Sequence, residues 1–149
     1  MLPTLQVLAV RYGYDDLSVA FPEVDIPVLT GAQRQGDVLV LPSRLPRALS
    51  GFGRRQRLSA GVVVVGSEAS SHTHTLYGDG TAQRLLATEP PRGATVAWLV
   101  VPEGGEAFLM HSDEHGALGI GPGTYEVRRQ MEYRDPEQQT ASYWEFVRD

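Results

Sequence analysis

The chain has 149 residues, of which 42% are hydrophobic, and its formal net charge is −5. This length suits one compact domain, and the negative charge argues against general binding to nucleic acids or anionic membranes. The absence of cysteine excludes disulfides and thiolate ligands, so a transition-metal site would have to use His, Asp and Glu. We see no secretory signal pattern and no run of about 18 apolar residues. We therefore expect a soluble, cytoplasmic protein that does not bind a membrane.

The first 34 residues predict an irregular N-terminal segment. LPTLQVLAV at 2–10 is compatible with a strand or a short helix, and FPEVDIPVL at 21–29 contains two prolines. Because proline lacks the N–H that a sheet ladder uses, we expect 21–29 to form an edge strand or an extended arm. We assign residues 1–34 to this N-terminal strand or arm and residues 35–149 to the main domain.

Short apolar runs bounded by glycine and proline fill the main domain, and they indicate strands. The expected strands cover 36–42, 61–66, 72–77, 81–87, 94–102, 106–111, 123–133 and 142–148. The GDG sequence at 78–80 predicts a hairpin turn that pairs the third of these strands with the fourth, and GALGIGPG at 116–123 has the composition of a loop. Many short strands with glycine-rich turns predict an all-β fold, either an antiparallel barrel or a sandwich.

An arginine-rich segment, RLPRALSGFGRRQR at 44–57, lies between two expected strands and contains no acidic residue. The reading that we favour is a solvated loop whose arginines pair with the surplus carboxylates elsewhere. The alternative is contact with a phosphate or an RNA. Nucleic-acid binding is therefore not expected, except through the arginines of this segment, which are Arg44, Arg47, Arg54, Arg55 and Arg57.

The four histidines of the chain fall into two closely spaced pairs, His72 with His74 and His111 with His115. Residues two apart on a strand share a face and lie about 6.5 to 7 Å apart, so the first pair has a spacing that suits two ligands of one ion. Acidic residues accompany both pairs: Asp79 follows the first, and Asp113 and Glu114 lie inside the second. The sequence predicts one shared site for a divalent transition metal, with Zn, Fe, Mn or Ni all compatible.

Each histidine pair taken alone is more often a packing feature, and all four together can also form a hydrogen-bonded cluster without metal. If a metal is bound, it is either structural or the centre of a hydrolytic or oxidative site. In the catalytic case Glu114 is the candidate general base. The spacing from Gly66 to His72 and His74 matches the first cupin motif, with Asp79 in the place of its acidic ligand, but the second cupin motif is absent.

From about Gln35 onward the order of landmarks resembles a family of small, uncharacterised bacterial and phage-associated proteins. The matching stretches are GDVLVLP, SHTH at 71–74, HSDEH at 111–115 and GPGTYEVRRQMEY at 121–133. The sequence departs from the family pattern at Ser71 and Met131 and by one extra residue in HSDEH. The resemblance implies that the four histidines belong together, and it suggests a phage or mobile-element setting without naming an activity.

Two functions follow from these observations. The first is a small histidine-rich metal-binding β protein, with an unknown substrate if it is an enzyme. The second is a non-catalytic, phage-related binding or assembly module that uses the arginine-rich segment or exposed edge strands, the latter to form homo-oligomers. In the YEVRRQMEY segment, alternation places Glu126, Arg128, Gln130 and Glu132 on a polar face, either solvated or hydrogen-bonded to the imidazoles.

Overall fold

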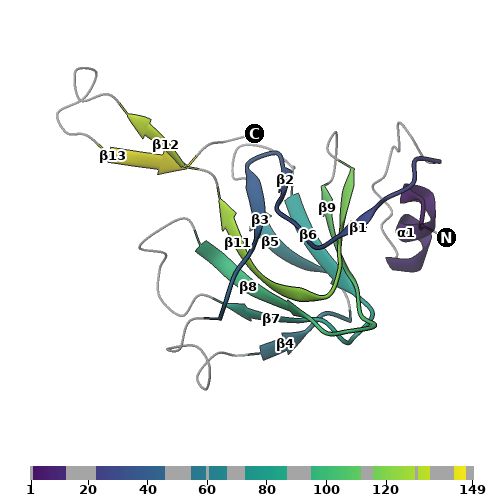
Figure 1. Cartoon of the computed structure of the whole chain (residues 1–149). Coiled ribbons are helices and arrows are strands. Elements are labelled where there is room, and N and C mark those ends of the chain that lie inside the picture. Colours follow the sequence, from purple (N-terminus) through teal and green to yellow (C-terminus); the bar gives the residue numbers. More distant parts are fainter. Residues whose placement is uncertain are drawn as a thin grey trace.

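The chain folds into two β-sheets packed face to face (Figure 1). The computed structural model describes residues 2–12, 23–45, 55–59, 61–66, 73–86, 95–111, 116–129, 131–134 and 143–146. No helix within these residues is long and apolar enough to cross a membrane.

The described strands form a five-stranded sheet in the order β1-β10-β9-β6-β5, a six-stranded sheet in the order β2-β3-β11-β8-β7-β4, and a separate hairpin of β12 and β13. We call the first two sheet B and sheet C. The strands of sheet B are β1 (Val28–Leu29), β5 (Val62–Gly66), β6 (Thr73–Gly78), β9 (Ala107–His111) and β10 (Ala117–Ile120). Those of sheet C are β2 (Gln33–Gln35), β3 (Val38–Pro42), β4 (Arg55–Arg57), β7 (Gln83–Leu86), β8 (Thr95–Val101) and β11 (Gly123–Arg129). The hairpin consists of β12 (Met131–Arg134) and β13 (Tyr143–Phe146), and the one helix among the described residues is α1 (Leu5–Tyr12).

The main core lies between the two sheets. Along β8 the residues Ala97, Leu99 and Val101 are buried while the alternate residues are half-buried, which is the two-residue period of a strand with one inner face. Leu76 of β6 and Val127 of β11 lie in the same apolar cluster as Leu99 and Val101. The edge strands of the two sheets do not pair with each other among the described residues. The all-β prediction is confirmed, and of its two forms the sandwich is the one observed.

A second apolar cluster explains why some strands lack alternation. All five residues of β9 are buried, because α1 covers the outer face of sheet B. Leu5 and Leu8 of the helix pack there with Phe108 and Met110 of β9. The 2–10 stretch, compatible with a strand or a helix by sequence, therefore forms a helix because its apolar residues have this second surface to cover.

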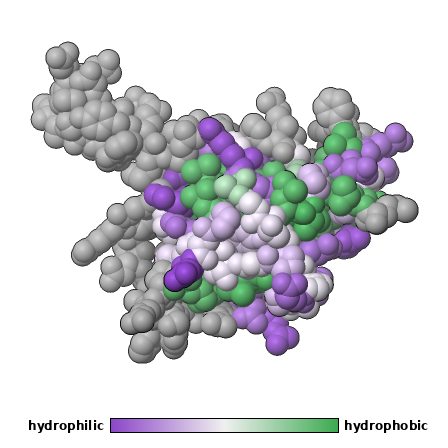
Figure 2. Space-filling model, in the orientation of Figure 1, coloured by the Kyte–Doolittle hydropathy of each residue, from purple (hydrophilic) through white to green (hydrophobic). Residues whose placement is uncertain are grey.

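The described part of the 21–29 segment, residues 23–29, contains a short edge strand at residues 28–29, while residues 21 and 22 lie outside the described residues. Its strand β1 is parallel to β10 at the rim of sheet B. The outer side of α1 and this segment remain apolar and exposed, with Val10 at 79% relative exposure and Leu29 at 46%. In Figure 2 hydrophobic surface is visible in this region, at the right of the view.

The expected hairpin between β6 and β7 is wrong. The two strands lie in different sheets, so the GDGT turn carries the chain across the sandwich. The carboxylate of Asp79 accepts hydrogen bonds from the backbone N–H (2.9 Å) and the hydroxyl of Thr81, and the N–H of Gly80 donates to the Leu58 carbonyl at 2.8 Å. These bonds hold the chain in a crossing turn, whereas a hairpin would need ladder bonds between β6 and β7.

Three strands occur where none was predicted, and one predicted strand is divided. Strand β10 lies in the GALGIGPG sequence, β4 lies in the arginine-rich segment, and β2 precedes the GDVLVLP run. The expected strand 123–133 separates into β11, which belongs to sheet C, and β12, which pairs with β13 in a hairpin that projects from the sandwich (Figure 1).

Candidate functional site

Two of the four histidines lie side by side in the structure. His74 of β6 and His111 of β9 are directly opposite each other in the antiparallel ladder, and their ring centroids are 4.3 Å apart with the planes tilted by 57°. Both are buried, with relative exposures of 1% and 0%. Two imidazolium ions at this distance would repel each other strongly in a buried site.

The other predicted site residues do not join this pair in the part of the chain that the structure describes. His72, His115 and Glu114 lie outside the described residues. Asp79, suggested as an additional ligand, lies beyond the far end of β6 from His74 and is exposed. The hydrogen bond from the Thr81 hydroxyl lowers the pKa of Asp79, so this carboxylate stabilises the crossing turn.

Gln35 of β2 reaches from sheet C across to sheet B and bonds His74. Its Nε2 donates to the Leu109 carbonyl at 2.9 Å and to the Gly116 carbonyl at 3.2 Å. Its Oε1 is 3.0 Å from Nδ1 of His74. Only 2% of Gln35 is exposed, so all three contacts are made away from water.

Asp37 lies on the other side of the His74 ring. It occupies the two-residue turn between β2 and β3, where Gln35 pairs with Val38 and Gly36 has a φ of 57°. No described non-glycine residue has a positive φ, so the turn has the type II′ form with glycine first. The turn directs the Asp37 carboxylate inward: the residue is 2% exposed, and its Oδ1 is 3.1 Å from Nε2 of His74.

Arg129, at the end of β11, faces the second oxygen of Asp37. Its Nε is 3.5 Å from Oδ2 of Asp37, and its side chain is 25% exposed. The sequence left the opposite face of this strand as either solvated or hydrogen-bonded to the imidazoles. On the described part of that face, Glu126 accepts from Thr95 of β8 at 2.5 Å and pairs with Arg128 at 3.4 Å.

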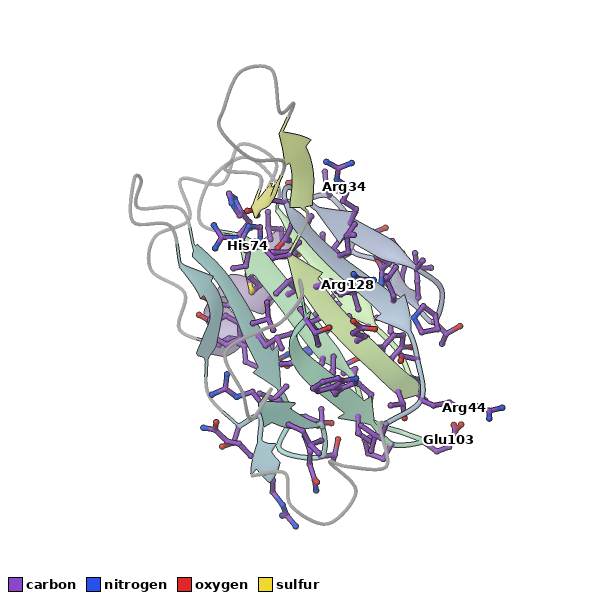
Figure 3. The ribbon with its side chains drawn as sticks, turned by 90° about the vertical axis from the view of Figure 1, so that its left-hand side faces the viewer. Arg34, Arg44, His74, Glu103 and Arg128 are labelled. Atoms are coloured by element: carbon purple, nitrogen blue, oxygen red, sulfur yellow. The ribbon has the colours of Figure 1, made fainter. Side chains whose placement is uncertain are left out.

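Together these residues form a buried polar cluster between the sheets, which we call the His–Asp cluster: Gln35, Asp37, His74, His111 and Arg129. It lies toward one end of the sandwich, and Figure 3 shows His74 on the same side as Arg34 and away from Arg44 and Glu103. Among the residues that the structure describes, no three His, Asp or Glu side chains are arranged so that they could hold a metal ion. Two donors, Nε2 of His74 and Oδ1 of Asp37, nevertheless lie close enough to share a proton or a cation.

The arginine-rich segment takes no part in this cluster as far as it is described. Arg44 and Arg57 are exposed, and the backbone of β4 pairs with β7 at the edge of sheet C. Arg47, Arg54 and the side chain of Arg55 are outside the description.

The sequence model of one protein family matches residues 34–130, which is more than half of the chain. The chain belongs to this family, a domain of unknown function named DUF8820. All members of the His–Asp cluster lie within the matched DUF8820 range. No curated protein and no solved structure matches the chain.

Three residues of this DUF8820 cluster were missed by sequence reasoning. Gln35 and Asp37 flank the glycine of a QGD turn, and turn residues are usually exposed. The available signal was a tight Gly-Asp turn just before a strongly apolar strand, a position from which a side chain can reach the core. Arg129 lies on the same face of β11 as the buried Tyr125 and Val127. An arginine at the end of a buried face needs an ion-pair partner, because burying an unpaired charge is costly.

Proposed function

We propose that the chain is a metal-binding β-sandwich domain in which one divalent transition metal ion joins the two sheets. The observation that carries the proposal is the 3.1 Å separation of His74 Nε2 from Asp37 Oδ1. Two donors that each lie about 2.1 Å from one ion, at about 90 to 109°, are roughly 3.0 to 3.4 Å apart. His74 belongs to sheet B and Asp37 to the β2–β3 turn of sheet C, so an ion between them would link the two layers.

The remaining ligands would be histidines. His111 packs against the His74 ring. Along the chain, His72 lies two residues before His74, and His115 lies four residues after His111. A set of imidazoles with one carboxylate suits Zn, Fe, Mn or Ni. In this proposal the four histidines supply up to four nitrogen donors. Asp37 supplies the carboxylate ligand, in place of Asp79, Asp113 and Glu114, which lie near the histidines in the sequence.

We propose a structural role for the ion, because the described donors are almost entirely buried. Asp37, His74 and His111 are each at most 2% exposed, whereas a catalytic metal keeps a coordination position open to water or substrate. A structural ion needs no general base, so Glu114 has no catalytic task in this proposal.

The test is the effect of metal on thermal unfolding. Ligand present at 100 times its Kd stabilises the native state by about 2.7 kcal/mol, which for a chain of this size corresponds to a rise in Tm of roughly 5 to 10 °C. We expect Zn²⁺ to raise the Tm of the chelator-treated protein by this order, and we expect the rise to disappear in His74→Ala. The exposed Asp25→Asn variant is the control and should keep the rise.

A Tm that responds neither to chelator nor to Zn²⁺, Mn²⁺, Fe²⁺ or Ni²⁺ would contradict the proposal. In that case the 3.1 Å contact is a buried imidazolium–carboxylate pair. The same reasoning predicts that protons compete with the metal for Nε2, because an imidazole must be neutral to bind an ion. The metal-induced rise should therefore shrink as the pH is lowered.

A further inference from the structure

Gln35 makes an unusual set of contacts for a side chain at the rim of a sandwich. It leaves sheet C at β2 and ends in sheet B, where it contacts His74, the backbone of Leu109 within β9 and the backbone of Gly116 just before β10. The neighbouring Gln33, two residues earlier on the same face of β2, also crosses to sheet B and donates to the Gly119 carbonyl at 2.8 Å. This hydrogen bond of Gln33 goes to a backbone carbonyl and not to a histidine, which makes Gln33 a natural comparison.

The two carbonyl contacts fix the orientation of the Gln35 amide. A carbonyl oxygen only accepts hydrogen bonds, so the Gln35 atom that lies 2.9 Å from Leu109 O and 3.2 Å from Gly116 O must be the NH₂ group. The reversed amide would place one oxygen against two others and lose both bonds. Oε1 therefore faces His74 as an acceptor.

An acceptor at Nδ1 determines the tautomer of His74. Because Oε1 of Gln35 has no hydrogen to give, the 3.0 Å contact requires that Nδ1 carries the proton. Nε2 is then the nitrogen that shares a proton or an ion with Asp37, 3.1 Å away, and once that proton has left its lone pair can bind an ion. We propose that Gln35 is a positioning residue, which fixes the Nδ1–H tautomer of His74 and so selects Nε2 as the atom that binds an ion. The part of this inference that concerns the ion rests on the proposed function, while the part that concerns the tautomer does not.

Metal-binding histidines usually donate their second ring N–H to a fixed acceptor, and loss of that acceptor costs roughly 10- to 100-fold in metal affinity. Gln35 meets this description with its own orientation locked by two backbone carbonyls. It also ties the imidazole of sheet B to strand β2 of sheet C, so the ring is held from the opposite layer.

The experiment compares Gln35→Leu with the matched Gln33→Leu, since both remove a bond from β2 to sheet B and only the first removes the acceptor of His74. The tautomer is read by long-range ¹H–¹⁵N NMR of the imidazole in metal-free protein at a pH where the ring is neutral. Parent, Gln33→Leu and Gln35→Leu all carry Asp37→Ala in this experiment, so that no carboxylate competes for the ring proton, and the His74 signals are assigned by their loss in His74→Ala. We expect the Nδ1–H form in the parent and in Gln33→Leu, and a mixed or Nε2–H form in Gln35→Leu. If Gln35→Leu does not fold, Gln35→Met, which retains the side-chain length, takes its place.

The second readout is Zn²⁺ affinity, measured by competition with a chromophoric chelator. We expect roughly a 10- to 100-fold loss for Gln35→Leu and a much smaller loss for Gln33→Leu. An Nε2–H tautomer in the parent protein, or an unchanged tautomer in Gln35→Leu, overturns the inference whether or not an ion binds. An Nδ1–H tautomer that depends on Gln35, in a protein that takes up no metal, upholds the tautomer assignment and refutes the proposed function alone.

Discussion

Substitution of Asp37 by Asn should destabilise the metal-free protein strongly. Asp37 is 2% exposed and lies 3.1 Å from Nε2 of His74, which is 1% exposed. Two unit charges at this distance attract by about 5 kcal/mol at an effective dielectric constant near 20. Part of this energy offsets the desolvation of both groups, and breaking such a buried pair costs about 3 to 5 kcal/mol in practice.

The assay is urea unfolding in the presence of a chelator at neutral pH. Asp25→Asn makes the same chemical change at an exposed position and should alter stability by less than about 0.5 kcal/mol. The expected loss for Asp37→Asn corresponds to a Tm lower by roughly 6 to 20 °C. The double variant Asp37→Asn, His74→Ala should lose less than the sum of the single losses, because the two residues contact each other.

Equal stability of Asp37→Asn and Asp25→Asn would refute this reasoning. So would strict additivity in the double variant, since it would mean that the carboxylate and the imidazole do not interact. Either result would also remove the basis for an ion shared by Nε2 and Oδ1.

Three further predictions concern the packing and the turns of the sandwich. Gly119→Ala should lower the free energy of unfolding by about 1 to 3 kcal/mol, because a Cβ at this position would lie 2.5 Å from the carbonyl oxygen of Pro27. A Cβ at Gly31 has no atom within 4 Å, so Gly31→Ala should be nearly neutral. Urea unfolding measures both. Leu8→Ala should lower the free energy of unfolding by about 2 to 5 kcal/mol, because Leu8 is fully buried between α1 and sheet B. Val10→Ala, on the same helix at 79% exposure, should cost far less. Equal losses would show that α1 does not pack as described. Asp79 has a pKa below its ordinary value of 3.8 because of the hydrogen bonds that it accepts from Thr81. Its contribution to the free energy of unfolding is therefore complete above pH 3.8 and is lost as the pH falls through the lower pKa of the folded state. The difference in stability between the parent and Asp79→Asn should close at acidic pH, and a difference that widens there would contradict this assignment.

Much of the fold follows from the sequence because alternation and glycine-rich turns are local signals. The runs GDVLVLP and GVVVVG become β3 and β5, and β1, which follows Pro27, lies at the edge of its sheet. The crossing of the GDGT turn could not be predicted, because a hairpin and a change of sheet use the same turn residues. What distinguishes them is the bond from Gly80 to Leu58, which is a tertiary contact. The strand β10 was missed for a related reason: its ALGI sequence is short and glycine-interrupted, and it is stabilised by pairing with β9 on one side and β1 on the other.

The candidate site was predictable only in part. The HxH spacing drew attention to His74, and the second histidine pair drew attention to His111, which the ladder places opposite each other. The carboxylate came from elsewhere: Asp37 is 37 residues from His74 along the chain, and only the packing of sheet C on sheet B brings them together. Local spacing favours acids that are close in sequence, such as Asp79, although five residues along a strand separate it from His74 by about 16 Å.

The most direct test of the central claim is elemental analysis of protein purified without a histidine tag, performed on the parent, His74→Ala and Asp25→Asn. The account predicts close to one Zn, Fe, Mn or Ni ion per chain in the parent and in Asp25→Asn, and loss of that ion in His74→Ala. A parent protein that contains no transition metal and takes none up when it is added would contradict the account, and the His–Asp cluster would then be a buried ion pair that joins the two sheets without a metal.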